Sequence, residues 1–237
     1  MLQACLNGSR SRDYHAAVPH TPEEVAAEAE KAVLAGADEL HIHVYAEHGE
    51  ESMEPADVDR LLRVVREKVP GIPVGLSTAW RILPDPVARL ECIRAWNVLP
   101  DYVSVNVNEE DAEPVIAALL KRGIGVEAGL SSPEDAEIFA SMPQRDRCLR
   151  VLIEMQSPED DRGTVRRIRQ ILRETECYLP QLLHGFDSTV WPMYTEAVLL
   201  GLDRRVGFED GCKLMSGLTA LDNADMVRIA KLLQGGN

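Results

Sequence analysis

The sequence predicts a single-domain α/β protein of the (β/α)8 TIM-barrel class. Short apolar runs alternate with longer amphipathic segments along the chain, and this alternation repeats eight times with short connections. Barrels of this class have about 250 residues, and the chain has 237 residues without a compositional break. We therefore expect residues 1–237 to form one TIM-barrel catalytic domain. An open, doubly wound sheet is the alternative, because a count of strands does not prove that the sheet closes.

The eight expected strands are short apolar runs, and each is followed by an expected amphipathic helix. The strands are expected at residues 2–8, 39–46, 72–79, 102–107, 124–130, 148–155, 178–186 and 204–210. The helices are expected at residues 21–36, 55–68, 85–95, 111–123, 132–142, 160–174, 188–201 and 221–234. The first helix has the clearest signals: Thr21 as N-cap, Pro22 at the first helical position, Glu24 completing a capping box, and Gly36 at the end.

Composition excludes several classes of partner. The formal net charge of −14 argues against a nucleic-acid backbone or an anionic membrane as the main partner. No apolar run approaches the length of a membrane span, and the first ten residues do not have the pattern of a signal peptide. The five cysteines are scattered without CxxC spacing, which is typical of reduced thiols. We expect a cytoplasmic protein.

A candidate metal site is formed by the second and eighth strands. His41 and His43 are two residues apart, so a strand would point both imidazoles to the same side. Glu209 and Asp210 lie where the eighth strand should leave the core, and in a barrel only the first strand separates it from the second. Two histidines and one carboxylate with an open position suit a catalytic zinc. The same set also suits non-haem iron, so the metal stays open at this point.

Further polar residues occur at the expected strand ends, where barrel enzymes place their chemistry. Hydroxyl and amide side chains there could hold a substrate carbonyl or carboxylate, although each alone is more often a cap or loop residue. Arg205 precedes Glu209 by four residues, so we expect it on the same face, where it could bind a substrate carboxylate or a neighbouring acid. The other candidates are Arg10, Ser77, Ser104, Asn106 and Glu127.

Four segments together resemble the β-keto acid cleavage enzymes, whose founding activity is 3-keto-5-aminohexanoate cleavage. They are "VPHTPEEVAAEAEKAVLAGADELHIHV", "VGLSTA", "RVGFEDG" and "NADMVRIAK". The resemblance runs over nearly the whole chain and implies a TIM barrel that binds zinc. It also implies a transferase that condenses a β-keto acid with acetyl-CoA, releasing acetoacetate and the CoA ester of the remaining acid. The resemblance further implies a homo-oligomer, because family members usually are, and more specifically a tetramer.

The resemblance also implies roles for individual residues. His41, His43 and Glu209 would be the zinc ligands, and Asp210, Arg205 and Glu127 would be catalytic. The substrate-binding residues would be Ser77, Ser104, Asn106 and Arg10.

The chain departs from the family pattern at two positions near the expected site. Tyr45 stands where the family has an arginine after HxHV, and Arg10 stands about where it has an acid. An anionic substrate or the phosphates of CoA would suit Arg10. Two alternatives follow: another metal-dependent barrel enzyme, such as an epimerase or aldolase, and a binding protein that has lost the cleavage chemistry.

Overall fold

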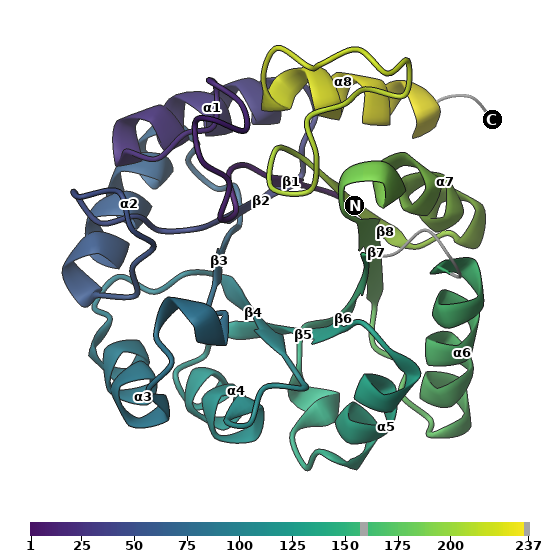
Figure 1. Cartoon of the computed structure of the whole chain (residues 1–237). Helices are drawn as coiled ribbons and strands as arrows, with labels where there is room; N and C mark the ends of the chain where they lie inside the picture. The colour runs from purple at the N-terminus through teal and green to yellow at the C-terminus, as the bar shows by residue number, and fades with distance from the viewer. Residues whose placement is uncertain (157–160, 235–237) are drawn as a thin grey trace.

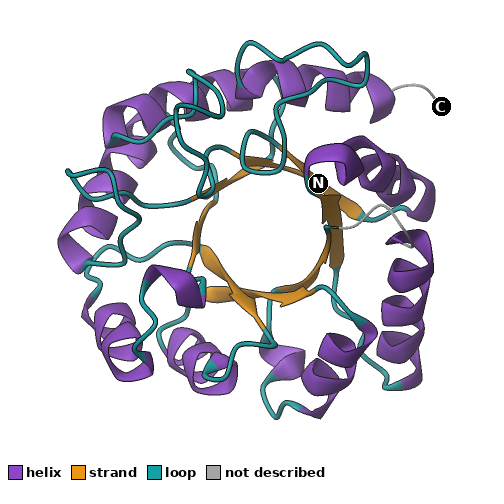
Figure 2. Cartoon of the chain, in the orientation of Figure 1, coloured by secondary structure: helices purple, strands orange, loops and turns teal. Residues whose placement is uncertain are grey.

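Eight parallel strands, each paired with its neighbours in chain order, close into a barrel because β8 pairs with β1 (Figure 1). The computed structural model describes residues 1–156 and 161–234. In Figure 2 the strands form an inner ring and the helices an outer ring around it. The prediction of a TIM barrel is confirmed, and the open doubly wound sheet is excluded.

Each expected strand and helix is present, with shifts at the ends. The strands are β1 (Leu2–Cys5), β2 (Glu39–Ile42), β3 (Val74–Ser77), β4 (Tyr102–Asn106), β5 (Gly125–Leu130), β6 (Arg150–Met155), β7 (Gln181–Gly185) and β8 (Asp203–Val206). The helices are α1 (Pro22–Leu34), α2 (Pro55–Lys68), α3 (Pro86–Ala95), α4 (Ala112–Lys121), α5 (Pro133–Ser141), α6 (Asp161–Glu174), α7 (Val190–Leu200) and α8 (Asn223–Gln234). Residue 160, the expected first residue of the sixth helix, lies outside the described residues. Within the described ranges, no helix is both long and apolar enough to cross a membrane.

The strands separate an apolar layer from a polar interior. Leu40 and Ile42 of β2 are fully buried in the hydrophobic core, and they alternate with Glu39 and His41. Because successive side chains of a strand point to opposite sides, the apolar set packs against the helices while the polar set faces the barrel axis. Burial of one such Leu or Ile side chain contributes about 1.5–3 kcal/mol. The outer layer therefore stabilises a fold whose interior can carry polar groups.

Three strands end three or four residues earlier than their apolar patterns predicted. β1 ends at residue 5 instead of 8, β2 at residue 42 instead of 46, and β8 at residue 206 instead of 210. At the end of β8, Gly207 has a φ of 155°, and a Cβ there would lie 2.1 Å from the carbonyl oxygen of Cys5. Glycine therefore lets the chain leave β8 in direct contact with the end of β1. As a result, His43, Glu209 and Asp210 lie in loops just beyond their strands.

A buried polar cluster fills the barrel near the N-terminal ends of the strands. The Gln3 side-chain amide donates hydrogen bonds to Glu39 Oε1 and Glu127 Oε1, both at 2.9 Å. Arg150 Nε donates to Glu127 Oε1 at 2.7 Å, and Arg150 also pairs with Glu39. The Tyr102 hydroxyl completes the cluster by accepting a hydrogen bond from Gln3 at 3.0 Å. Glu127, expected among the catalytic residues, thus lies in an ionic network at the opposite end of the barrel from the site described next.

Candidate active site

A cavity of about 270 Å³ opens at the C-terminal ends of the strands, where barrel enzymes place their active sites. Ser77 and Asn106 are the last residues of β3 and β4, and both line it. The cavity brings together residues from loops and strands around the whole ring. They are Ser9, Arg10, His41, His43, Ser77, Ala79, Arg81, Ser104, Asn106, Leu152, Glu154, Gln156, Phe186, Arg205 and Glu209.

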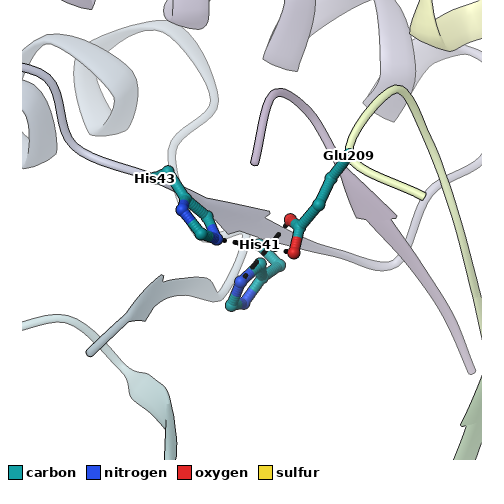
Figure 3. A group of neighbouring side chains, drawn as sticks. All are labelled: His41, His43 and Glu209. Atoms are coloured by element: carbon teal, nitrogen blue, oxygen red, sulfur yellow. Dashed lines mark ion pairs between the residues drawn. The ribbon is translucent and has the colours of Figure 1, made fainter. Parts of the chain in front are cut away.

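His41, His43 and Glu209 converge at one point of this cavity (Figure 3). His43 Nε2 lies 3.4 Å from Glu209 Oε1, and His41 Nε2 lies 3.7 Å from Glu209 Oε2. Tetrahedral ligand atoms at about 2.0–2.1 Å from zinc stand about 3.3 Å apart, so the spacing fits a bound divalent ion. Glu209 Oε2 is also buried without a hydrogen-bond partner among the described residues. The three side chains therefore form a candidate metal site with room for a further ligand.

Two neighbours in the first loop hold this arrangement in place. The side-chain amide of Asn7 donates to the carbonyl oxygen of His43, and its Oδ1 accepts from the backbone N–H of His43, both at 2.9 Å. This reciprocal pair continues the contact between β1 and β2 after the strands have ended. Gly8 has a φ of 57°, and a Cβ there would lie 2.4 Å from Glu209 Cγ. The absence of a side chain at Gly8 therefore makes room for the candidate carboxylate ligand.

Glu51 and Arg81 contact His43 at its Nδ1 atom, on the opposite side of the ring from Glu209. Glu51 Oε1 contacts His43 Nδ1, the nitrogen that faces away from Glu209, and Arg81 pairs with Glu51. A carboxylate on the second imidazole nitrogen fixes the tautomer and ring orientation of a metal-binding histidine. Sequence reasoning missed both residues, because they lie in the loops after β2 and β3, where no strand or helix periodicity places a side chain. For Glu51 the sequence offers one signal, an acid eight residues after His43.

The electrostatics favour the metal-binding forms of His41 and Glu209 and oppose that of His43. Burial lowers the pKa of His41 to about 3, so its imidazole is neutral. Burial opposes ionisation of Glu209, but Arg205 and the two histidines hold its pKa well below the usual range. Burial also disfavours a charged His43, but the carboxylates of Glu209 and Glu51 raise its pKa overall. A neutral imidazole and a carboxylate are the states that bind a cation, so metal binding would compete with protonation of His43.

Arg205 and Asp210 form an ion pair beside the candidate ligands. Arg205 Nη2 donates to Asp210 Oδ1 at 2.8 Å, and Nε lies 3.2 Å from both carboxylate oxygens. Arg205 Nη2 also lies 2.5 Å from Glu209 Oε1. Although burial disfavours the charged form, Arg205 and His184 lower the pKa of Asp210 overall. Arg205 was expected on the same strand face as Glu209, but β8 has ended before Glu209, and the contact depends on the turn that follows.

Arg10 and Tyr45, the two departures from the family pattern, both tie loops together. Arg10 Nη2 donates to Asp187 Oδ1 at 2.8 Å, and its Nε donates to the carbonyl oxygen of Glu209 at 3.1 Å. Arg10 thus joins the loop after β1 to the loops after β7 and β8, with its guanidinium at the cavity wall. Tyr45 donates its hydroxyl to the carbonyl oxygen of Gly8 at 2.7 Å. It is half-buried outside the cavity, so it acts on the loop that carries Gly8.

Most of the predicted site residues lie together. Asp210 is fully buried behind Arg205 and does not line the cavity, whereas Glu127 belongs to the cluster near the other end of the barrel. The predicted residues that line the cavity are Arg10, His41, His43, Ser77, Ser104, Asn106, Arg205 and Glu209. Glu154 and Gln156 of the sixth unit also line it and were not among the predicted residues.

Fold and site together define a TIM-barrel enzyme for small molecules, with a candidate metal centre at the C-terminal face of the barrel. The chain belongs to the β-keto acid cleavage enzyme family, whose model matches residues 1–178 and 182–234. It is 25% identical to the 3-keto-5-aminohexanoate cleavage enzyme of Fusobacterium nucleatum subsp. nucleatum, over 98% of this chain and 90% of that protein. The family resemblance seen in the sequence is therefore confirmed, and the protein is a β-keto acid cleavage enzyme.

Solved structures with this architecture are more distant in sequence. The apo structure of ObcA has a TM-score of 0.73 at 18% identity, covering 91% of this chain and 61% of that chain. The tryptophan synthase alpha chain from Legionella pneumophila subsp. pneumophila has a TM-score of 0.62 at 14% identity, covering 100% and 93% of the two chains. At these identities the likeness shows the fold alone.

Proposed function

We propose that the protein is a zinc-dependent enzyme that condenses a β-keto acid with acetyl-CoA and releases acetoacetate and a CoA ester. One observation carries the proposal: the candidate metal ligands His41, His43 and Glu209 share a cavity with Arg205, which is paired to Asp210. The cavity volume of about 270 Å³ suits a small acid. In this proposal residues 1–237 act as one catalytic domain.

His41, His43 and Glu209 would hold the metal ion. When bound, the ion supplies a Lewis acid that polarises the keto oxygen of the substrate. We assign it as zinc because two imidazoles and one carboxylate with an open position are a catalytic zinc set. Glu51 would orient His43 through its second nitrogen.

The remaining groups would bind and activate the acid. The Ser77 and Ser104 hydroxyls and the Asn106 amide would hydrogen-bond its oxygens. Arg10, at the cavity wall, would attract an anionic group of the acid or of CoA. Glu127 has no contact with substrate in this proposal, because its carboxylate is bonded to Arg150 and Gln3.

Asp210 would act as the base, reached past the Arg205 side chain, because its carboxylate is buried behind Arg205 and does not line the cavity. It is ionised, because its pKa is lowered, and it can therefore accept a proton from C2 of the keto acid. Arg205 would steady the negative charge that develops on the substrate. The C2 carbanion forms a bond to the acetyl carbonyl carbon, and the thioester C–S bond breaks to release the CoA thiolate. The thiolate then attacks the original keto carbon, the bond from that carbon to C2 breaks, and C2 regains a proton to give acetoacetate and the CoA ester.

Activity and metal content of the purified protein test this function together. Each member of a panel of β-keto acids would be incubated with acetyl-CoA, and acetoacetate and the new CoA ester would be measured. The proposal expects turnover of at least one acid and about one zinc per chain by elemental analysis. Bound metal without turnover of any acid would favour a binding role, and turnover that survives complete metal removal would overturn the metal requirement.

We also propose that the enzyme works in the cytoplasm as a homo-oligomer, a tetramer by family resemblance. All five cysteines are free, in keeping with a reducing compartment. Light scattering coupled to size-exclusion chromatography would give the mass in solution, and a mass of one chain would contradict the tetramer.

A further inference from the structure

His184, in β7, is a buried titratable group without a role in the proposed reaction. Its side chain is fully buried beside the Arg205–Asp210 pair. His184 Nδ1 lies 3.2 Å from Asp210 Oδ2, and Nε2 lies 3.7 Å from Glu154 Oε2. Glu154 lines the cavity, so the imidazole stands between a cavity-wall carboxylate and the proposed base.

We propose that His184 is a positioning residue that holds the Asp210 carboxylate against Arg205 through its Nδ1–H, with Glu154 facing its other nitrogen. The inference deepens the proposed function and rests on it, because it assumes that Asp210 is the base. His184 acts through Asp210 and does not itself line the cavity.

The hydrogen-bond geometry explains why a second anchor matters. Arg205 approaches both oxygens of Asp210 from one side, whereas His184 approaches Oδ2 alone. Without the imidazole, the carboxylate could rotate about its Cβ–Cγ bond while keeping a contact to Arg205. A base that is misplaced by about 1 Å can lose about 100-fold in rate. His184 therefore fixes the angle that a guanidinium alone leaves free.

The surrounding charges favour a doubly protonated ring. The groups facing His184 are the Asp210 carboxylate at Nδ1, the Glu154 carboxylate near Nε2, and the Arg205 guanidinium behind Asp210. Burial and Arg205 disfavour a charged imidazole, but the carboxylates raise the pKa of His184 overall. Nε2 has no hydrogen-bond partner among the described residues, and Glu154 Oε2 is the carboxylate oxygen at ion-pair distance. The Asp210 carboxylate therefore favours a proton on Nδ1, and the Glu154 carboxylate favours a second proton on Nε2.

Three substitutions at His184 distinguish loss of the hydrogen bond to Asp210 from loss of side-chain volume. His184→Asn keeps an amide N–H near the position of Nδ1, His184→Gln places its amide near the position of Nε2, and His184→Leu keeps neither. We expect kcat of His184→Asn within about tenfold of wild type, and losses of about 100-fold for the other two, with KM changed by less than threefold. Metal content and thermal stability would be compared in all three, with His48→Asn, in the exposed loop after β2, as the control. Equal losses in all three variants, or wild-type kcat in all three, would overturn the proposal.

A spectroscopic measurement tests the same point without activity. In the metal-loaded, ¹⁵N-labelled protein, the imidazole nitrogen shifts of His184, assigned by their loss in His184→Asn, should show a proton on Nδ1 at neutral pH. An Nδ1 without a proton would overturn the proposal even if the enzyme is active. Absence of turnover by the wild type would reject the proposed function. The proton on Nδ1 would still be detected or excluded in that case, so the two failures can be told apart.

Discussion

Arg205 contacts both Asp210, at 2.8 Å, and Glu209, at 2.5 Å, from the same Nη2 atom. A single guanidinium therefore links the candidate metal ligand to the proposed base. Burial would disfavour its charge, but Asp210 and Glu209 hold the pKa of Arg205 well above its usual value. In the proposed reaction the two acids of the RVGFEDG segment would have different tasks, Glu209 as a metal ligand and Asp210 as the base, although they are adjacent in sequence.

Arg205→Lys should lower kcat by about 100-fold or more, because a lysine keeps the charge but lacks the planar fork of donors that serves two carboxylates at once. Retention of the charge should keep the fold, since no buried carboxylate is left without a cation. Steady-state kinetics on the most active β-keto acid would measure the loss. Arg204→Lys is the matched control, because Arg204 is adjacent on β8 and does not line the cavity. Equal kinetics for both variants would show that the fork is not needed.

His41→Ala and His43→Ala should each abolish stoichiometric divalent metal, because two ligands cannot replace the three that converge here. Elemental analysis after dialysis against a weak chelator is the measurement. His48→Ala, in the exposed part of the loop after β2, should keep the metal. Full metal content in both His41 and His43 variants would place the ion elsewhere.

Glu51→Gln should weaken metal affinity by about 10–100-fold, because the carboxylate that orients His43 is lost while all three ligands remain. Competition with a coloured chelator of known affinity would measure the change. Glu50→Gln changes the preceding, exposed acid and should leave the affinity at the wild-type value. If the two variants bind metal equally, the contact of Glu51 with His43 has no part in the metal site.

Gly8→Ala should also weaken metal binding, by displacing a ligand instead of removing one. A Cβ at Gly8 would lie 2.4 Å from Glu209 Cγ, and the φ of 57° strains any other L residue. Glu209 must then move away from His41 and His43. The same chelator competition applies, with Gly49→Ala as the control, because Gly49 also has a positive φ but has nothing within 4 Å of its Cβ position. If Gly8→Ala and Gly49→Ala lose metal affinity to the same extent, backbone strain and not displacement of Glu209 is the cause.

The sequence was sufficient to predict the barrel and to bring His41, His43 and Glu209 to one end of it, because the barrel and the His41–His43 pair depend on patterns with a fixed period. Alternation along β2 placed His41 and His43 on one side, and the order of eight units brought β8 next to β1. The depth of a residue inside the barrel has no such pattern: Glu127 faces the interior as expected, but near the N-terminal end. Glu51 and Arg81 were missed because loop conformation, not periodicity, brings them to His43.

The polar cluster near the N-terminal ends of the strands should make the free energy of unfolding depend on pH. Burial raises the pKa of Glu39 above 4.5, and Arg150 offsets this only in part. An acid whose folded pKa is raised destabilises the fold above that pKa, and this cost disappears as the pH falls through the folded value towards about 4.5. Glu39→Gln removes the charge and keeps a side chain of similar shape. Its free energy of unfolding, relative to wild type, should therefore increase between pH 5 and pH 8.

Urea unfolding of both proteins at a series of pH values would measure this difference. Titration of the metal ligands is common to the two proteins and cancels when they are compared at the same pH. Glu50→Gln, at an exposed position, provides the baseline for loss of one negative charge from a chain of net charge −14. A difference that stays constant with pH, or that moves in favour of wild type as the pH rises, would mean that Arg150 fully stabilises the Glu39 carboxylate.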